Sequence, residues 1–413
     1  MKKIFLILIT ILILIFIGIF AFQKIFKSSD ELIDLNNSSI EEQTKNYINI
    51  DKTSPTTNQV NDTENTVLTN VNNDIFSSYY NQANKILKSM TIEEKVGQLF
   101  LVRYPESGVI NQIKDYSPGG YILFGRDFKN ETKESILKEI TNCQNNSKIE
   151  MFFGVDEEGG TVVRVSEFSA FRETPFQSPQ ALWQEGRLPR ILEDSHEKSA
   201  LLKSIGINMN LAPVADVPTD TSSFIYKRSY GRGAEKTAIY VSELIKTMNE
   251  DNMISVMKHF PGYGDNVDTH TGIAIDKRDY SEFENTDFLP FESGIDANGP
   301  AILVSHNIVN CMDDNLPASL SERVHNVLRK ELGFTGIIMT DDLVMDAVKS
   351  YVQDGEAAVQ AILAGNDMII SSDFVTQKNE ILNAVENGKI SEEIINTAVK
   401  RIIACKYFYG IIK

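Results

Sequence analysis

The chain has 413 residues, 42% of them hydrophobic, and carries 57 acidic against 40 basic side chains, a formal net charge of −17. This length allows one large domain or two ordinary ones with a substantial core. The charge argues against nucleic acid as a ligand, because no basic stripe is available to neutralise phosphates. The three cysteines, Cys143, Cys311 and Cys405, are too widely spaced for a disulfide framework or a metal-ligand pattern, and we expect buried free thiols.

Residues 1–27 have the pattern of a segment that spans a membrane. Lys2 and Lys3 precede a charge-free apolar run over residues 4–22, long enough to cross a hydrocarbon layer of about 30 Å at about 1.5 Å per residue. The run is longer than the apolar part of a cleaved signal peptide, and no clear Ala-x-Ala site follows it. We expect an uncleaved signal anchor with the remainder of the chain outside the cell, or a secreted protein if cleavage occurs near Ala21.

Residues 28–74 predict a disordered polar linker. Asn, Thr, Ser, Asp and Glu dominate this stretch, aromatic residues are few, and no hydrophobic period is sustained. Such a composition buries too little apolar surface to offset the entropy lost on ordering. We expect the linker to separate the anchor from a globular domain over residues 75–413.

Apolar runs rich in β-formers alternate with helical patterns through the globular domain. The runs predict eight strands, over residues 97–103, 120–124, 151–155, 207–211, 254–257, 301–304, 336–339 and 367–370. Helical patterns follow over residues 133–142, 235–249, 321–332 and 355–364, and two helices over 379–388 and 391–409 end the chain. Ser321 is a typical helix start and Gly333 a typical stop. Apolar strands separated by helices predict a parallel sheet covered on both faces.

Eight strand–helix units fit a (β/α)8 TIM barrel in a single catalytic domain. A doubly wound open sheet is the alternative, but neither Gly-rich nucleotide-binding motif of such sheets occurs. Barrel enzymes carry their chemistry at the carboxyl ends of strands. Polar residues follow five of the predicted strands, at residues 156–158, 216, 258–259, 306–307 and 341–342. This distribution predicts a catalytic barrel.

The segment from Lys258 to His270 contains the strongest single signal. A predicted strand ends in Lys258-His259, a Pro-Gly break follows, and the loop beyond it holds Asp268 and His270. Imidazole titrates near neutral pH, which favours a role in proton transfer. The alternative is an incidental histidine in a solvated turn. Asp268, two residues before His270, favours the functional interpretation.

Carboxylates and arginines near other strand ends complete the set of candidates. Asp341 follows a hydrophobic strand and is a candidate nucleophile, whereas Asp342 is placed to cap a helix that begins with Leu343-Val344-Met345. Asp156 is suited to accept hydrogen bonds from sugar hydroxyls. Arg164 would pair with Asp156 or with substrate, and Arg228 would reach the site from an insertion after the fourth strand.

A metal site is the weaker interpretation of the same residues. His259, Asp265, Asp268 and His270 are suitable ligand types for a divalent ion. The first predicted strand carries no His-x-His pair of the kind that metal-dependent barrel hydrolases use, and the spacing of the two Asp does not match a calcium loop. We therefore predict neither a metal nor a cofactor.

Five motifs together resemble glycoside hydrolase family 3, in its bacterial β-N-acetylhexosaminidase branch. They occupy residues 90–99, 155–160, 210–216, 258–270 and 340–343, in the family's order. The resemblance implies a TIM barrel and retaining hydrolysis, with Asp341 as nucleophile and His270 as acid/base, oriented by Asp268. It also implies a monomer that binds GlcNAc-containing glycans from the cell wall. The sugar-binding residues that it implies are Asp156, Arg164, Arg228, Lys258 and His259.

The sequence departs from the family pattern at two positions, and three alternative functions remain open. Tyr263-Gly264 stands where the family usually has His-Gly, and Thr269 stands where it has Ser. The first change is expected to affect loop packing or leaving-group contacts more than the reaction. A phosphorylase using the same residues and a β-glucosidase of the same family are the nearest alternatives, and a metal-dependent barrel hydrolase is more distant.

Overall fold

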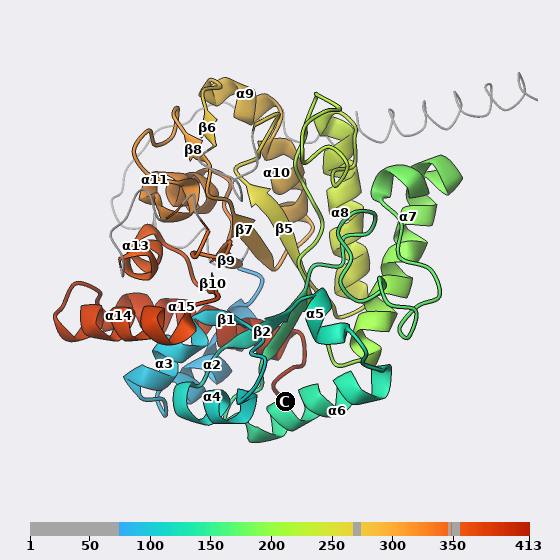
Figure 1. Cartoon of the computed structure of the whole chain (residues 1–413). Helices are drawn as coiled ribbons and strands as arrows, with labels where there is room; N and C mark the ends of the chain where they lie inside the picture. The colour runs from blue at the N-terminus through green and yellow to red at the C-terminus, as the bar shows by residue number, and fades with distance from the viewer. Residues whose placement is uncertain (1–73, 267–273, 346–347, 349–355) are drawn as a thin grey trace, which may run out of the picture. The chain divides into compact units, whose positions relative to one another are not determined.

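The computed structural model of the chain describes residues 74–266, 274–345, 348 and 356–413. Eight strands in these residues form one parallel sheet in the order β10-β1-β2-β3-β4-β5-β7-β9, and β6 and β8 form a separate parallel pair (Figure 1). The strands are β1 (Phe100–Arg103), β2 (Gly120–Leu123), β3 (Phe152–Val155), β4 (Met209–Asn210), β5 (Ile254–Phe260), β6 (Ile275–Asp276), β7 (Ala301–Val304), β8 (Ile308–Val309), β9 (Ile337–Thr340) and β10 (Ile369–Ser371).

The two ends of the eight-stranded sheet meet at β9 and β10. Met339 and Met368 form a parallel bridge, and the Thr340 N–H donates to the Met368 carbonyl at 3.2 Å. The sheet is thus a nearly closed parallel barrel, and the prediction of an eight-stranded α/β barrel is confirmed at this level.

Helices follow the strands along the chain, and Figure 1 shows them around the outside of the sheet. The α-helices are α2 (Tyr80–Leu87), α3 (Ile92–Gln98), α4 (Val109–Tyr116), α5 (Gly125–Phe128), α6 (Lys133–Asn146), α7 (Pro179–Ser204), α8 (Ala234–Glu250), α9 (Tyr280–Asn285), α10 (Phe288–Asp296), α11 (Glu322–Asn326), α13 (Ala357–Ala364), α14 (Phe374–Glu386) and α15 (Glu392–Phe408). Short 3-10 or π turns are η1 (Ser77–Tyr79), η2 (Ala318–Leu320) and η3 (Val327–Glu331). Every residue of β2, β3, β7 and β9 is buried, which explains why these strands are apolar without alternation.

Local chemistry explains most helix boundaries and two of the differences from prediction. The Ser321 hydroxyl accepts a hydrogen bond from Val324 N–H, and Gly333 has a φ of +67°, so the predicted start and stop are confirmed. Between them, α11 passes into the π turn η3. The strand predicted from residue 97 begins only at Phe100, because the capping box of Thr91 starts a helix that runs to Gln98.

Other strands and helices are longer or shorter than the sequence predicted, because strand pairing and core packing decide where they end. The strand predicted over 207–211 has only two paired residues in β4, whereas β5 continues three residues beyond its predicted end at 257, to Phe260. Helix α14 begins at Phe374 rather than at 379, because Phe374 packs into the core. Of the cysteines, Cys143 and Cys405 are buried as expected, but Cys311 is exposed, so that prediction was wrong for it.

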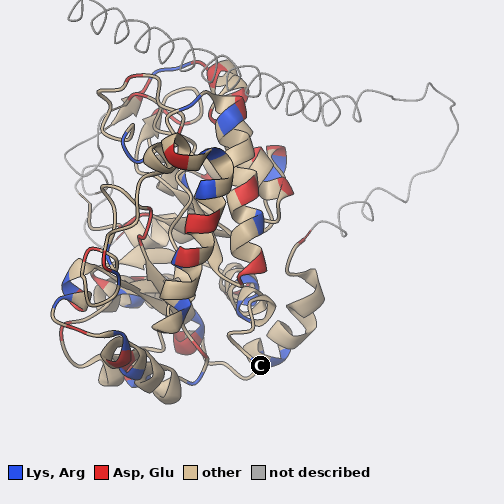
Figure 2. Ribbon diagram, turned by 90° about the vertical axis from the view of Figure 1, so that its right-hand side faces the viewer, with Lys and Arg blue, Asp and Glu red and all other residues tan. Residues whose placement is uncertain are grey.

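The predicted anchor and almost all of the linker precede the first described residue, so both stay predictions. Within the described ranges, none of the helices combines the length and the hydropathy needed to cross a bilayer. Figure 2 shows basic and acidic residues interspersed along the helices that face the viewer.

Candidate active site

A cavity of about 270 Å³ lies at the carboxyl ends of the barrel strands. It brings together six of the eight predicted site residues, which come from the ends of four strands, β3, β4, β5 and β9, or the segments after them. The six are Asp156, Arg164, Arg228, Lys258, His259 and Asp341, and Arg103, Phe124 and Asp342 also line the cavity. The carboxyl end of the strands is where a barrel enzyme carries its chemistry.

Lys258, at the end of β5, joins two carboxylates from the loop after β3. Its Nζ lies 2.6 Å from Asp156 Oδ1 and 2.6 Å from Glu158 Oε1. Asp156 is therefore paired with Lys258 and not, as one sequence interpretation had it, with Arg164. An ammonium group has three N–H donors, so one remains for a ligand. The second oxygen of Asp156 makes no hydrogen bond to a described residue and can accept one from a ligand hydroxyl.

Glu158 also binds Arg228, which reaches the cavity from the segment between β4 and α8. Arg228 Nε and Nη2 donate to the two carboxylate oxygens at 3.0 and 2.7 Å, a bidentate geometry that orients the guanidinium. Burial alone would raise the pKa of Glu158, but the charges of Lys258 and Arg228 hold it well below its ordinary value. Glu158 is thus a permanent anion at neutral pH.

Aromatic rings hold the segment that carries Arg228. Tyr230 stacks on Tyr240 of α8 with ring centroids 4.5 Å apart, and Trp183 of α7 meets Tyr230 edge-on at 5.6 Å. Gln180 donates to the Tyr226 carbonyl at 2.6 Å. These contacts come from two helices outside the barrel, so Arg228 is positioned by packing as well as by its ion pair.

His259 is fixed in one tautomer by an acid on one side and an arginine on the other. Asp216 Oδ2 lies 2.8 Å from Nδ1, and Arg228 Nη2 lies 3.2 Å from Nε2. Because a guanidinium only donates hydrogen bonds, Nε2 accepts and the ring proton is on Nδ1. In this arrangement Nε2 has no proton to give to a ligand.

Tyr263, the departure from the family pattern, is buried beside this histidine. Its ring lies 5.0 Å from His259 and 5.1 Å from Phe224, centroid to centroid. Its backbone N–H donates to Asp216 Oδ1 at 2.8 Å. Tyr263 thus fills the space next to His259 at the base of the loop.

Arg164 is presented to the cavity by a turn that Glu157 holds. The Glu157 carboxylate accepts backbone N–H bonds from Arg164 and Val165, both at 2.8 Å, and from Ser166 at 3.2 Å. Arg164 Nε is buried and has no hydrogen-bond partner among the described residues. A guanidinium with an unused buried donor at a cavity wall is suited to bind a ligand oxygen.

The neighbouring carboxylates Asp341 and Asp342 have different surroundings. Asp342 accepts hydrogen bonds from the N–H groups of Val344 (3.1 Å) and Ser372 (3.2 Å) and from the Ser372 hydroxyl. It therefore holds the residues after β9, although residues 343–345 form a turn or bend and not the helix start that the sequence predicted. The backbone N–H of Asp341 donates to the Val304 carbonyl at 3.2 Å, which fixes its position beside β7.

Asp268 and His270 lie outside the described residues, so their predicted roles stay predictions. Within the described part, no group of three or more His, Cys, Asp or Glu is arranged to hold a metal ion. Asp265, one of the ligand types weighed, instead accepts the backbone N–H groups of Thr219 and Asp220, both at 2.8 Å.

Sequence reasoning missed two residues that organise the cavity, Glu158 and Asp216. Both were noted as acids near strand ends, but neither was assigned a role. Glu158 belongs to the run Asp156-Glu157-Glu158, and the available signal was that three adjacent acids need partners. Asp216 ends the motif over residues 210–216. Its partner His259 is 43 residues further along the chain.

The fold and the cavity define the chain as a barrel enzyme with a polar, charge-compensated site, and the comparisons with known proteins are consistent with this class. Residues 91–405 match the family described as Glycosyl hydrolase family 3 N terminal domain. The chain therefore belongs to glycosyl hydrolase family 3 and is a glycoside hydrolase, which confirms the resemblance seen in the motifs.

Individual relatives carry more specific names. The chain is 30% identical over 273 residues to a β-hexosaminidase of Nitrosomonas eutropha, covering 65% of this chain and 77% of the relative. It is 31% identical over 280 residues to a β-hexosaminidase of Methylobacillus flagellatus, covering 66% and 78%. The solved structure of a family 3 β-N-acetylglucosaminidase from Paenibacillus sp. FPU-7 matches with a TM-score of 0.73 and 30% identity, covering 78% of this chain and 63% of that one. The chain thus spans less than two thirds of the Paenibacillus protein.

Proposed function

We propose that the chain is a retaining β-N-acetylhexosaminidase that removes terminal β-linked N-acetylglucosamine from cell-wall-derived glycans or related oligosaccharides. The observation that carries the proposal is the cavity itself, in which Asp341 lies with Asp156, Lys258 and Arg228, the last two held by Glu158. The names of the β-hexosaminidase relatives support the choice of sugar.

In this proposal the charged cluster binds the hydroxyl groups of the terminal sugar. Asp156 accepts from one hydroxyl through its second oxygen, and Lys258 donates its remaining N–H to another. Arg164 contributes the buried Nε donor. Because Glu158 and Asp156 together balance Lys258 and Arg228, the site binds a neutral sugar without leaving a buried charge uncompensated.

The proposed reaction has two steps. Asp341 attacks the anomeric carbon while His270, oriented by Asp268, protonates the leaving oxygen, which gives a covalent glycosyl-enzyme. His270 then takes a proton from water, which releases the sugar with retained configuration. His259, whose Nε2 already accepts a hydrogen bond from Arg228, is unsuited to the acid role. This leaves the proton transfer to His270 on the loop that follows β5.

Product analysis tests the proposal directly. Purified chain is incubated with muropeptides and with chitooligosaccharides, with and without phosphate, and products are followed by NMR and mass spectrometry. We expect free N-acetylglucosamine, initially as the β-anomer, at a rate independent of phosphate. A sugar 1-phosphate would instead identify a phosphorylase, and a preference for aryl β-glucosides would identify a β-glucosidase.

A leaving-group comparison tests the role of His270. General acid assistance is worth roughly 10²–10⁴ in rate and matters most when the leaving oxygen is basic. His270→Ala is therefore expected to slow a poor leaving group by about 10²-fold or more, and an activated aryl glycoside much less. Equal losses on both substrates would remove His270 from the acid/base role.

We further propose a monomer that is held at the outer face of the cell membrane through residues 1–27. The support is the apolar run over residues 4–22 and its preceding lysines. Fractionation of cells that express the full chain or residues 28–413 tests the anchor. The full chain is expected in the membrane fraction after alkaline washing and the truncated chain in the soluble fraction; equal distribution would refute the anchor.

A further inference from the structure

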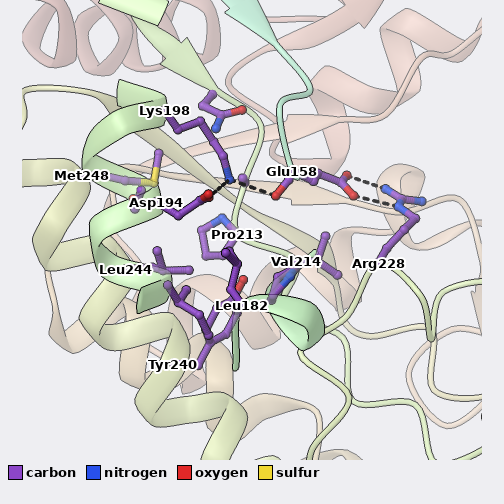
Figure 3. A pocket seen from close by; sticks show the side chains of 15 residues that line it. Glu158, Leu182, Asp194, Lys198, Pro213, Val214, Arg228, Tyr240, Leu244 and Met248 are labelled. Atoms are coloured by element: carbon purple, nitrogen blue, oxygen red, sulfur yellow. Dashed lines mark hydrogen bonds and ion pairs between the residues drawn. The ribbon is translucent and has the colours of Figure 1, made fainter. Parts of the chain in front are cut away.

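A second, smaller cavity is lined by Glu158 and by Arg228, which also lines the larger substrate cavity (Figure 3). Its volume is about 30 Å³, which suits one or two water molecules at about 10–15 Å³ each and excludes a sugar ring. Lys198 and Asp194 of α7 line it together with Glu158 and Arg228. The cavity therefore cannot bind substrate, and its polar residues need another explanation.

Lys198 is held between three groups at this point. Its Nζ donates to the Glu158 backbone carbonyl at 3.0 Å and lies 3.2 Å from Asp194 Oδ2, one turn earlier on the same helix. The Phe176 ring centroid is 5.2 Å away. Figure 3 shows Lys198 pointing from α7 toward Glu158, whose side chain points on toward Arg228.

The Asp194–Lys198 pair is a costly arrangement if stability is its only purpose. Asp194 is 2% exposed, and its Oδ2 is at ion-pair distance from Lys198 without a hydrogen bond to any described residue. Burying two charges usually costs as much as their attraction returns, so a buried ion pair is weak evidence for stability. Its position beside Glu158, which binds two residues of the substrate cavity, suggests what it does.

Lys198 completes the fixing of the Glu158 backbone. The Glu158 N–H donates to the Val162 carbonyl at 3.0 Å, and its carbonyl accepts from Lys198. Gly159 and Gly160 follow with φ of +101° and +66°, a backbone that side-chain-bearing residues rarely adopt. A shift of Glu158 would move both Arg228 and Lys258, because its two carboxylate oxygens hold them.

We propose that Lys198, held in place by Asp194, is a positioning residue for the sugar-binding cluster. It acts through the Glu158 carbonyl and touches no substrate. Loss of this hydrogen bond displaces Arg228 and Lys258 from the hydroxyl groups that they bind and weakens substrate binding more than the chemical step. The inference rests on the proposed function, in which Arg228 and Lys258 bind the sugar.

Lys198→Met tests the proposal, with Lys378→Met as the matched control. Lys378 of α14 likewise donates to a backbone carbonyl, that of Tyr116 at 2.8 Å, and its Nζ lies 5.4 Å from an aromatic ring. It does not line the substrate cavity. Wild type is first assayed on aryl N-acetylglucosaminide and aryl glucoside, which tests the proposed function separately, and the variants are assayed on the better substrate.

We expect Lys198→Met to raise KM about tenfold with kcat within about twofold, since small displacements at a binding cluster have effects of this order or larger. Lys198→Arg, which keeps a donor, should restore most of the loss. Lys378→Met should leave KM and kcat unchanged. An unchanged KM in Lys198→Met, or a loss confined to kcat, would overturn the proposal. If Lys198→Met fails to fold, the milder Asp194→Asn decides by the same KM criterion.

Discussion

Two buried lysines at opposite ends of the barrel have opposite surroundings. Lys258, at the carboxyl end, lies 2.6 Å from each of two carboxylates, those of Asp156 and Glu158. Lys406 of α15, at the amino end, donates to the Gln98 side-chain oxygen at 2.8 Å and lies 4.9 Å from the Phe152 ring. No described carboxylate is within ion-pair distance of Lys406. Burial lowers its pKa from 10.5 to about 7.

The difference shows where the barrel maintains charge. At the carboxyl end, compensating anions keep a cation available for a ligand, at the cost of burying several charges. At the amino end, a lysine serves as a long, partly neutral side chain with one hydrogen bond. In this barrel, a buried lysine that is kept charged by neighbouring anions indicates a functional site, whereas burial of a lysine alone does not.

The largest expected difference between the two ends is the effect of Asp341→Ala. Removal of the nucleophile at the carboxyl end should lower kcat/KM by about 10⁴-fold or more, while circular dichroism and melting temperature stay close to wild type. Hydrolysis of an aryl β-N-acetylglucosaminide measures the first and thermal unfolding the second. Retention of more than a tenth of the activity would show that another carboxylate, with Asp342 the nearest candidate, is the nucleophile.

Lys258→Met should affect both activity and stability. It removes a donor to the sugar and leaves Asp156 and Glu158 without one cation, so we expect a loss of about 10²-fold or more in kcat/KM. Breaking a buried ion pair on one side should also cost about 3–5 kcal/mol in the free energy of unfolding. Urea unfolding measures this cost. A variant of unchanged stability would contradict the view that these charges depend on each other.

Lys406→Met should do the reverse and stabilise the protein. Because burial lowers the pKa of Lys406 to about 7, this lysine reduces the free energy of unfolding by about 4 kcal/mol at pH 7. Its removal would leave the Gln98 oxygen without a partner, which would cancel about 2 kcal/mol of the gain. We therefore expect the free energy of unfolding to rise by about 2 kcal/mol at pH 7, with kcat/KM unchanged. A destabilised variant would mean that Lys406 is charged and paired in the folded state.

The last expected effect is a pH dependence of the free energy of unfolding that arises from Lys406. Between about pH 7 and 10.5 the unfolded chain binds a proton on this lysine that the folded chain does not, so stability rises with pH across this window. Between pH 7 and 9 the gain should be about 2 kcal/mol. The gain should be absent from Lys406→Met, so that the difference between the two proteins isolates it. Parallel stability curves would refute the lowered pKa.

The sequence was informative about the strands and about which strand ends carry polar groups. Apolar runs that are buried on both faces have no competing periodicity, so all eight barrel strands were found. Their limits were less accurate, because Gly97 and Gln98 continue a helix that begins with the capping box at Thr91, and a local cap is not visible in the apolar pattern.

The partners within the cavity were harder to predict, and the run Asp156-Glu157-Glu158 shows why. Asp156 binds Lys258, Glu157 turns away to hold the turn that presents Arg164, and Glu158 binds Arg228. Three adjacent acids thus have three separate tasks, which depend on backbone direction after β3. Residues 70 or more positions away complete two of them, and a single sequence contains no record of such pairs.

The packing of Trp183 against Tyr230 has a spectroscopic consequence. Trp183 is the single tryptophan of the 413 residues, and it meets the aromatic stack that holds the segment of Arg228. Its fluorescence emission therefore comes from one known place and reports on the segment that carries Arg228 into the cavity. Sugar binding can therefore be followed by the fluorescence of Trp183 in the unlabelled protein, without a chromogenic substrate.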